Sequence, residues 1–324
     1  MKHILLNLLR VLPVLLLLGA CDTITEEMEP CKNYVSFRYD RNMKFVDAFP
    51  VEVRRVNLYV FDADDRLVAT LSDERLAFGD GYRMELPLPV GDYRLIAWAG
   101  LYDRSYEFAP NLTVGVSTPE DLRVKMRRGA DNVQDNELDA LWHGEIPFTV
   151  TDGESRTVTL PLTKDTNKFR IVVQGAEMAL DKDDLDFTIT DDNGYLDSDN
   201  TLLPDEAITY RPYYRANADL SDSGDGQVSA VVAEMNTLRL IDGKHPRLRV
   251  THRNGKELVN IDLITYLLLT KMEGHDMPPQ EYLDRQDEYA LIFFLNRDAL
   301  GNYLLMYVKV NGWTIRPQEG EFGF

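Results

Sequence analysis

Residues 247–261 read RLRVTHRNGKELVNI and contain the clearest fold signal in the chain. Apolar and polar residues alternate on both sides of Asn254-Gly255, which is the pattern of two half-buried strands. Asn-Gly accepts the positive φ angles of a type I′ turn, whose twist matches that of the flanking strands. The stretch therefore predicts an antiparallel β-hairpin.

The same alternation continues outward from this hairpin through the second half of the chain. YLLMYVKVNGWTI (303–315) predicts a hairpin that turns at or near Asn311-Gly312. LDFTITDDNGYL (185–196) predicts another, which turns at Asn193-Gly194. Three Asn-Gly pairs among alternating strands predict a meandering antiparallel sheet.

The first half repeats the pattern with different turns. VRRVNLYVF and RLVATL flank DADD (62–65) and predict a hairpin. YRMELPL and YRLIAWA flank Pro89-Val90-Gly91-Asp92 and predict a second one. Trp98 lies in the alternating strand that follows this turn, so we expect it in the core, and Trp313 likewise.

Helical signals are sparse. QDNELDALWHG (134–144) predicts a short helix, and LVNIDLITYLLLTKM (258–272) and PPQEYLDRQDEY (278–289) predict two more before the strand ALIFFL. A boundary near LTKDTNK (162–168) divides the body into predicted domains at 33–163 and 164–324. The predicted fold class is all-β, with a few short helices.

The N-terminus carries an export signal. The apolar run Val11–Leu18 follows a basic flank and is shorter than the roughly 20 residues that span a bilayer. Leu18-Gly19-Ala20-Cys21 matches the box cut by lipoprotein signal peptidase. We therefore predict a signal peptide at 1–20, a lipid on Cys21 and an acidic flexible tether at 21–32. The alternative is ordinary secretion with a buried or disulfide-bonded cysteine.

Composition excludes one class of partner and supplies no crosslink. The chain has 324 residues and a net charge of −19, which repels phosphate backbones and argues against nucleic-acid binding. With Cys21 acylated, only Cys31 is left, so no internal disulfide can form and an idle thiol is expected.

Motifs for catalysis are missing from the sequence. No nucleophile elbow, phosphate-binding loop or dinucleotide fingerprint occurs, and the five histidines lack metal-ligand spacing. Acidic turns at Asp62 and Asp197 lack the glycine and closing glutamate of an EF-hand and read as solvated turns. We predict no enzyme activity, no metal and no cofactor; a secreted hydrolase on a β-scaffold has no supporting motif.

One aromatic cluster suggests a binding site. YRPYY places Tyr210, Tyr213 and Tyr214 in a less periodic stretch, where their rings could form a platform for a sugar. A cell-surface glycan-binding lipoprotein is therefore an alternative function.

Several motifs along the chain resemble those of one family. They are VNLYVFDADDRLV, LPVGDYRLIAWAGL, LPLTKDTNKFRIVV, TLRL at 237–240 and YVKVNGWTI, after the lipid box. As a set they resemble the FimB-type fimbrial anchor and assembly lipoproteins of type V fimbriae of Gram-negative anaerobes. The positions that carry the resemblance most specifically are Gly91, Tyr93, Trp98, Gly100, Asn311, Gly312 and Trp313.

The resemblance implies two tandem transthyretin-like β-sandwich domains. It also implies a lipid-anchored protein of the outer membrane that serves as anchor or accessory subunit of a fimbrium. Fimbrial structural subunits would be its partners, joined by donor-strand addition, in which one chain completes the sheet of its neighbour. Because cleavage after Arg54 or Arg55 would separate the body from its lipid, we expect no arginine-specific maturation.

Overall fold

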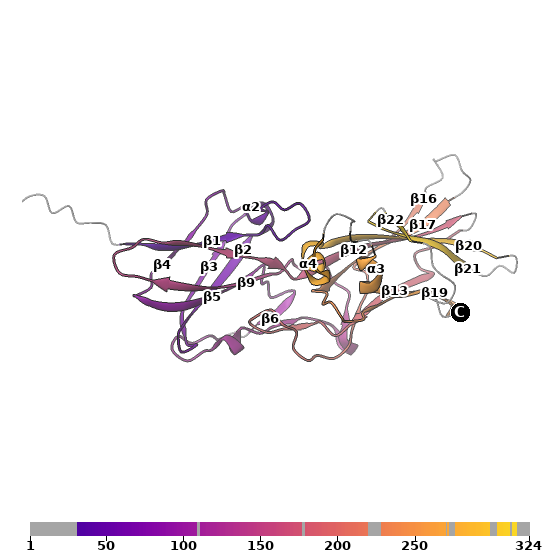
Figure 1. The fold of residues 1–324 in the computed structure, drawn as a ribbon. Coiled ribbons are helices and arrows are strands. Elements are labelled where there is room, and N and C mark those ends of the chain that lie inside the picture. Colours follow the sequence, from indigo (N-terminus) through magenta and orange to yellow (C-terminus); the bar gives the residue numbers. More distant parts are fainter. Residues whose placement is uncertain are drawn as a thin grey trace, which may run out of the picture.

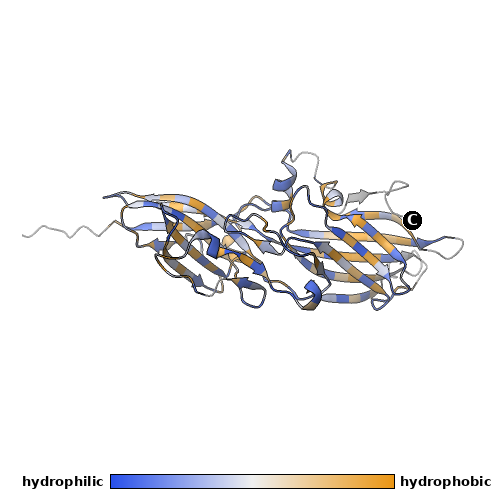
Figure 2. Cartoon of the chain, turned by 90° about the horizontal axis from the view of Figure 1, so that it is seen from below, coloured by the Kyte–Doolittle hydropathy of each residue, from blue (hydrophilic) through white to orange (hydrophobic). Residues whose placement is uncertain are grey.

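The computed structural model describes residues 31–108, 111–176, 179–219, 228–269, 271, 276–298, 303–311 and 313–315. These residues form an elongated body of two β-sandwiches joined end to end (Figure 1). Hydrophobic and hydrophilic residues alternate along the strands of both (Figure 2). The all-β prediction is thus confirmed. Over the same ranges, no helix has the length and apolar character needed to cross a membrane.

Two sheets build the first sandwich. The smaller one joins β1 to a parallel and an antiparallel neighbour, in the order β10 (Thr157–Pro161), β1 (Asn33–Arg38) and β4 (Met84–Leu86). The larger one is antiparallel, in the order β11 (Thr163–Lys164), β9 (Trp142–Val150), β5 (Gly91–Ala99), β2 (Arg55–Asp62) and β3 (Leu67–Glu74). A short helix, α2 (Phe49–Glu52), follows β1.

The second sandwich also has two sheets. One has the order β16 (Tyr214–Asp219), β17 (Val228–Leu238), β12 (Thr166–Ala176), β20 (Glu288–Arg297), β21 (Tyr303–Val310) and β22 (Trp313–Ile315). The other has the order β19 (Glu257–Asp262), β18 (Arg247–His252), β13 (Leu185–Asp191), β15 (Ile208–Tyr210) and β8 (Val133–Gln134). The helices α3 (Leu263–Leu268) and α4 (Pro279–Arg285) connect β19 to β20.

Strands from the first half of the chain enter the second sandwich. β8 lies parallel to β15, and a small sheet joins β14 (Tyr195–Leu196), β7 (Val124–Met126) and β6 (Tyr106–Phe108). Two 3₁₀ turns, Pro119–Leu122 and Ala130–Asn132, flank β7. Main-chain hydrogen bonds therefore tie the two sandwiches together.

The buried side chains fall into two clusters that share the central sheet of the first sandwich. Leu95 and Ala97 of β5 face one cluster, between the two sheets of the first sandwich. Ile96 and Trp98 face the other, which extends into the second sandwich. Both faces of this sheet are covered, which is why LIAWA is apolar at every position.

Three of the predicted hairpins are confirmed. β2 pairs with β3 across the DADD turn, β18 with β19 across Asn254-Gly255, and β21 with β22 across Asn311. Gly255 and Asn311 have positive φ angles of 86° and 48°, as a tight turn between twisted strands requires.

The hairpin predicted at Pro89–Asp92 is wrong. β4 pairs with β1 and β5 pairs with β2 and β9, so the two strands lie in opposite sheets of the first sandwich. Met84 and Leu86 pack against Leu95 and Ala97 across the core, and the short connection passes from one layer to the other.

The hairpin predicted at Asn193-Gly194 is also wrong, because β13 and β14 pair with other strands. Asn193 is buried: its amide donates to the carbonyl groups of Leu238 and Arg239, and its oxygen accepts a hydrogen bond from Tyr210 Oη. Gly194 has no room for a Cβ, which would collide with the side chain of Ile208. These residues are used for packing rather than for a turn.

The helix predicted at 134–144 is wrong as well. This segment is extended, and its backbone donors bind side chains from distant parts of the chain: Leu138 N donates to Asn236 Oδ1, and Asp139 N to Ser105 Oγ. The helix predicted at 258–272 is shorter than expected, because its first residues form β19. The helix predicted at 278–289 is confirmed in part: α4 ends at Arg285, and β20 already begins at Glu288.

Candidate functional site

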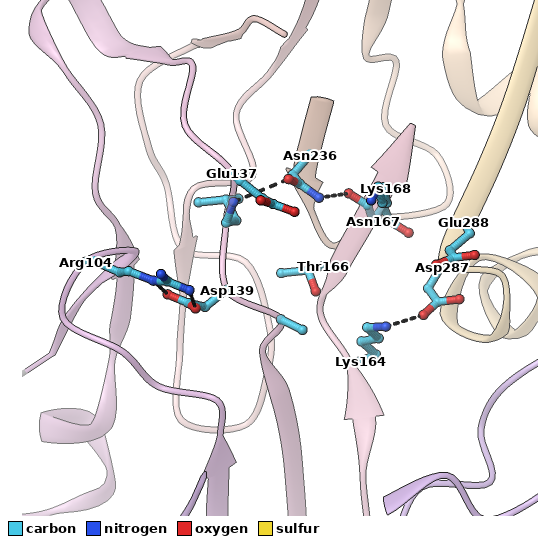
Figure 3. A pocket seen from close by; sticks show the side chains of 12 residues that line it. Arg104, Glu137, Asp139, Lys164, Thr166, Asn167, Lys168, Asn236, Asp287 and Glu288 are labelled. Carbon is cyan, nitrogen blue, oxygen red and sulfur yellow. Dashed lines mark hydrogen bonds and ion pairs between the residues drawn. The ribbon is translucent and has the colours of Figure 1, made fainter. Parts of the chain in front are cut away.

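Several hollows lie where the two sandwiches meet. Three adjoining hollows of about 530, 360 and 350 Å³ follow one another there. The first and second share Arg104, Asp139 and Ala140, and the second and third share Lys168 and Glu288. We call this row of neighbouring hollows the junction groove; Figure 3 shows the middle hollow.

Arg104 and Asp139 form one wall of the middle hollow (Figure 3). The carboxylate of Asp139 is buried and accepts both a two-pronged interaction from the Arg104 guanidinium and a 2.7 Å hydrogen bond from Ser105 Oγ. Asp139 is thus held by its neighbours, while 78% of the Arg104 side chain remains exposed to solvent.

Lys164 forms the opposite wall with Asp287, 2.5 Å away, and also lies 3.2 Å from Glu52 (Figure 3). Burial favours the neutral amine, but the carboxylates of Asp287 and Glu52 together hold the pKa of Lys164 above its usual value. The side chain therefore carries a positive charge that is neutralised locally.

A second polar cluster lies beneath the groove and is buried. Arg239 makes a bidentate ion pair with Asp284, at 2.8 and 2.9 Å, and Asn200 Nδ2 donates to Asp165 Oδ1 at 2.8 Å. Burial raises the pKa of Asp165 to about 7, although Arg239 and the hydrogen bond from Asn200 oppose this shift.

The second side-chain oxygens of Asp165 and Asn200 bear on whether Asp165 is protonated or ionised. Asp165 Oδ2 and Asn200 Oδ1 are both buried without a hydrogen-bond partner. A proton on Asp165 would let the acid donate to the amide while the amide donates to the acid, which satisfies both atoms. With a pKa of about 7, Asp165 is protonated below neutral pH, and the two unpaired oxygens favour this form.

His143 is buried in the same region and is neutral. Its Nε2 lies 2.8 Å from the carbonyl oxygen of Ser198, and its ring packs against Trp98 at 4.6 Å between centroids. Burial lowers the pKa of His143 to about 4. The neutral imidazole donates to Ser198 and links the two sandwiches.

A separate hollow of about 380 Å³ lies beside β1 in the first sandwich, lined in part by Phe37, Phe49 and Tyr82. The pairing of β1 with β4 ends at Val35–Met84. On its other side, β1 stays paired with β10 through Phe37–Leu160. The main-chain groups of Phe37 point to the same side as those of Val35, where β1 has no strand partner beyond Met84 among the described residues. The sheet is therefore open at this point.

The tyrosines of YRPYY lie in different environments. Tyr210 is fully buried in the second sandwich. Tyr213 is partly buried, and its Oη lies 3.3 Å from Glu234, which lines the third hollow of the junction groove. Half of the Tyr214 side chain is exposed at the start of β16. The three rings do not share one surface.

The family-motif residues of the first sandwich have packing roles. Tyr93 Oη donates to the carbonyl oxygen of Pro89, and Gly91 lies against the Tyr93 ring. Trp98 is fully buried, as expected, and its Nε1 donates to the Leu122 carbonyl. Gly100 has a φ angle of 74°, and a Cβ there would collide with the carbonyl oxygen of Ala140.

At the other end of the chain, Asn311 exchanges two 2.8 Å hydrogen bonds with the backbone of Ala290, which fixes the turn before β22. The backbone of Trp313 pairs with Val310, but its side chain lies outside the described residues. Gly312 and Cys21 lie outside them too.

The sequence did not reveal the junction groove or the buried cluster. Most of their members are ordinary polar residues, separated by up to 259 positions from Glu52 to Asn311, and no spacing rule connects them. The one available signal was LTKDTNK, which contributes Lys164, Thr166, Asn167 and Lys168 to the middle hollow.

The described residues thus form an extended all-β body with an open sheet edge and a row of polar hollows. Comparison with known proteins gives the family. Residues 28–319 match the model of the fimbrillin-A associated anchor proteins Mfa1 and Mfa2, so the chain belongs to this family and the resemblance seen in the sequence is confirmed.

Individual relatives agree with this assignment. The chain is 23% identical over 315 residues to the minor fimbrium anchoring subunit Mfa2 of Porphyromonas gingivalis, covering 94% of this chain and 92% of the relative. A solved candidate polysaccharide-binding protein from Bacteroides thetaiotaomicron is 38% identical, with a TM-score of 0.80 over 90% of this chain and 100% of that one. A candidate adhesin from the same species is 31% identical, with a TM-score of 0.78 over 89% of this chain and 99% of that one.

Proposed function

We propose that this protein is an outer-membrane lipoprotein that anchors a fimbrium or serves as one of its accessory subunits. The carrying observation is that the family match covers residues 28–319 and begins seven residues after the lipid box that ends at Cys21. A lipid on Cys21 would hold the body at the membrane through the acidic segment 21–32. The role is structural rather than enzymatic.

In this proposal, a fimbrial subunit joins the protein by adding a β-strand to its sheet. The open edge of β1 at Phe37 supports this, because an added strand would pair with its free main-chain groups. The adjoining hollow has aromatic walls from Phe37, Phe49 and Tyr82, which would receive apolar side chains of the added strand.

Crosslinking in assembled fimbriae tests this arrangement. A photoreactive amino acid at position 79, where Gly79 has open space around it and lines the hollow, should capture a fimbrial subunit. The same group at the exposed Val114 is the control and should capture much less. Equal capture at both positions would contradict strand addition at β1.

Deletion of the gene tests the anchoring role independently. Cells without the protein should shed fimbriae into the medium or carry fimbriae of altered length, as measured by electron microscopy and by immunoblotting of the culture supernatant. Fimbriae that remain attached and of normal length would count against an anchor.

Glycan binding is a second candidate function, because the relative that is 38% identical is described as a candidate polysaccharide-binding protein. The polar junction groove offers a place for such a ligand. The two functions are compatible, since the groove and the open edge of β1 are lined by different residues.

A further inference from the structure

We propose that the junction groove binds a short stretch of a polysaccharide, with an acidic sugar at the end lined by Arg54. This inference rests on the second candidate function and gives it a site and a ligand class.

The size and shape of the groove suit a chain of sugars. Each of its three hollows falls within the roughly 300–1,000 Å³ typical of small-ligand sites. Their shared walls, Arg104–Asp139 and Lys168–Glu288, place them in a row across the junction. A linear ligand with several similar units fits a row of similar hollows.

The lining favours hydroxyl groups over peptide side chains. The middle hollow alternates bases, acids and amides, so donors and acceptors are interspersed, and a sugar hydroxyl both donates and accepts. Its apolar contributions are limited to Leu138 and Ala140. A bound peptide would need apolar anchor pockets, which this lining does not offer.

One hollow contains an arginine without an ion-pair partner. In the hollow of about 530 Å³, Arg104 pairs with Asp139, and Glu52 shares Lys164 with Asp287. Arg54 lines the same hollow and forms no ion pair among the described residues. An arginine without a carboxylate partner favours an anionic ligand group, which it can bind with two hydrogen bonds.

The shape of this hollow fits a sugar ring. Tyr102 forms a wall, with the Arg55 guanidinium 4.5 Å over one face of its ring. Gly100 leaves a backbone floor against Trp142 because it has no side chain. An aromatic wall beside a guanidinium can pack against the apolar face of a sugar while its carboxylate meets Arg54. A uronic acid combines these two features.

The opposite end of the groove is also polar and adjoins the tyrosine cluster. Lys168 and Arg170 line the third hollow, with Glu234 between them at 3.9 and 3.6 Å. Tyr213 Oη lies 3.3 Å from the same carboxylate. A ligand that spans the groove would therefore contact Lys168 whether or not its sugars are acidic.

Titration calorimetry on the full chain in detergent tests the proposal. The probes are tetramers of galacturonic, glucuronic and mannuronic acid, each paired with its carboxyl-reduced form. Arg54→Ala should lower the affinity for an acidic tetramer roughly tenfold and leave the reduced form unaffected. Lys168→Ala should weaken both forms, and Arg66→Ala, an exposed arginine in the β2–β3 turn, should change neither.

Two outcomes would overturn the inference in different ways. If an acidic tetramer binds and Arg54→Ala and Lys168→Ala both retain wild-type affinity, glycan binding stands but the groove is not the site. If no tetramer in either form binds, both the groove site and the second candidate function fail. The anchoring function is judged by crosslinking and fimbrial attachment and is unaffected by either result.

Discussion

Replacing Asp165 by asparagine should stabilise the protein at neutral and alkaline pH. The carboxylate of Asp165 is fully buried, and its Oδ2 has no hydrogen-bond partner, as is also true of Asn200 Oδ1. Asparagine at 165 would still accept from Asn200 Nδ2, and its own amide would donate to Asn200 Oδ1. The substitution therefore reproduces the protonated acid without the need for a proton.

The pKa of Asp165 sets the size of the effect. A native value of about 7 against an ordinary value of 3.8 corresponds to about 4 kcal/mol. Because the native pKa is raised, the native state binds more protons than the unfolded state between pH 3.8 and about 7. The wild type therefore loses this contribution to its stability as the pH rises through the window, whereas the Asp165→Asn variant has no titrating group at position 165.

Urea unfolding at several pH values measures this difference. The free energy of unfolding of Asp165→Asn minus that of the wild type should grow by about 3 kcal/mol between about pH 4.5 and pH 8. Subtraction removes the contribution of His143, which changes stability in the opposite direction. The exposed Asp64, changed to asparagine, is the matched control and should show little difference.

The result that would refute this reasoning is a variant less stable than the wild type by the same amount at both pH values. Asp165 would then be ionised in the native state throughout, and its charge would be needed beside Arg239. Nuclear magnetic resonance of the carboxyl carbon of Asp165 would decide between the two forms directly.

Three further predictions concern other parts of the chain. Cys21→Ala should move the protein from the membrane fraction to the soluble fraction without changing its thermal unfolding; unchanged fractionation would contradict lipidation. Gly100→Ala should lower the free energy of unfolding by about 2–4 kcal/mol, because φ is 74° and the Cβ would collide with Ala140, and wild-type stability in urea would contradict this. His143 should titrate near pH 4 by nuclear magnetic resonance. Because its native pKa is lowered, its contribution to stability should be lost as the pH falls from about 6.5 to 4. An ordinary titration near 6.5 would argue against a buried donor to Ser198.

The alternation of apolar and polar residues was enough to predict many of the strands but not all of the strands they pair with. It located β2, β3, β18 and β19 because each pair is joined by a tight turn. It failed at Pro89–Asp92 because a short connection between layers has the same turn residues as a hairpin within one layer. Which sheet a strand joins depends on packing across the core, and local sequence does not contain that information.

The failed helix at 134–144 has a different cause. Its sequence pattern is compatible with a helix, but Leu138 N and Asp139 N receive better partners from Asn236 and Ser105, which are distant in the chain. The same segment supplies Glu137, Leu138 and Asp139 to the junction groove. The sequence predicted neither the groove nor the extended segment, because both depend on contacts between residues that are distant in the chain.

The way the two sandwiches are joined bears on what the groove can do. A site between two bodies linked only by a flexible connection would change shape as they moved, and a ligand would have to bear the entropic cost of ordering them. Here β8 pairs with β15 and β7 with β14, and one apolar cluster runs from the first sandwich into the second. The groove walls are thus fixed before any ligand arrives, so exposed groove residues such as Arg54 should affect affinity alone, whereas substitutions in the buried cluster of Arg239 and Asp284 should reduce both stability and binding.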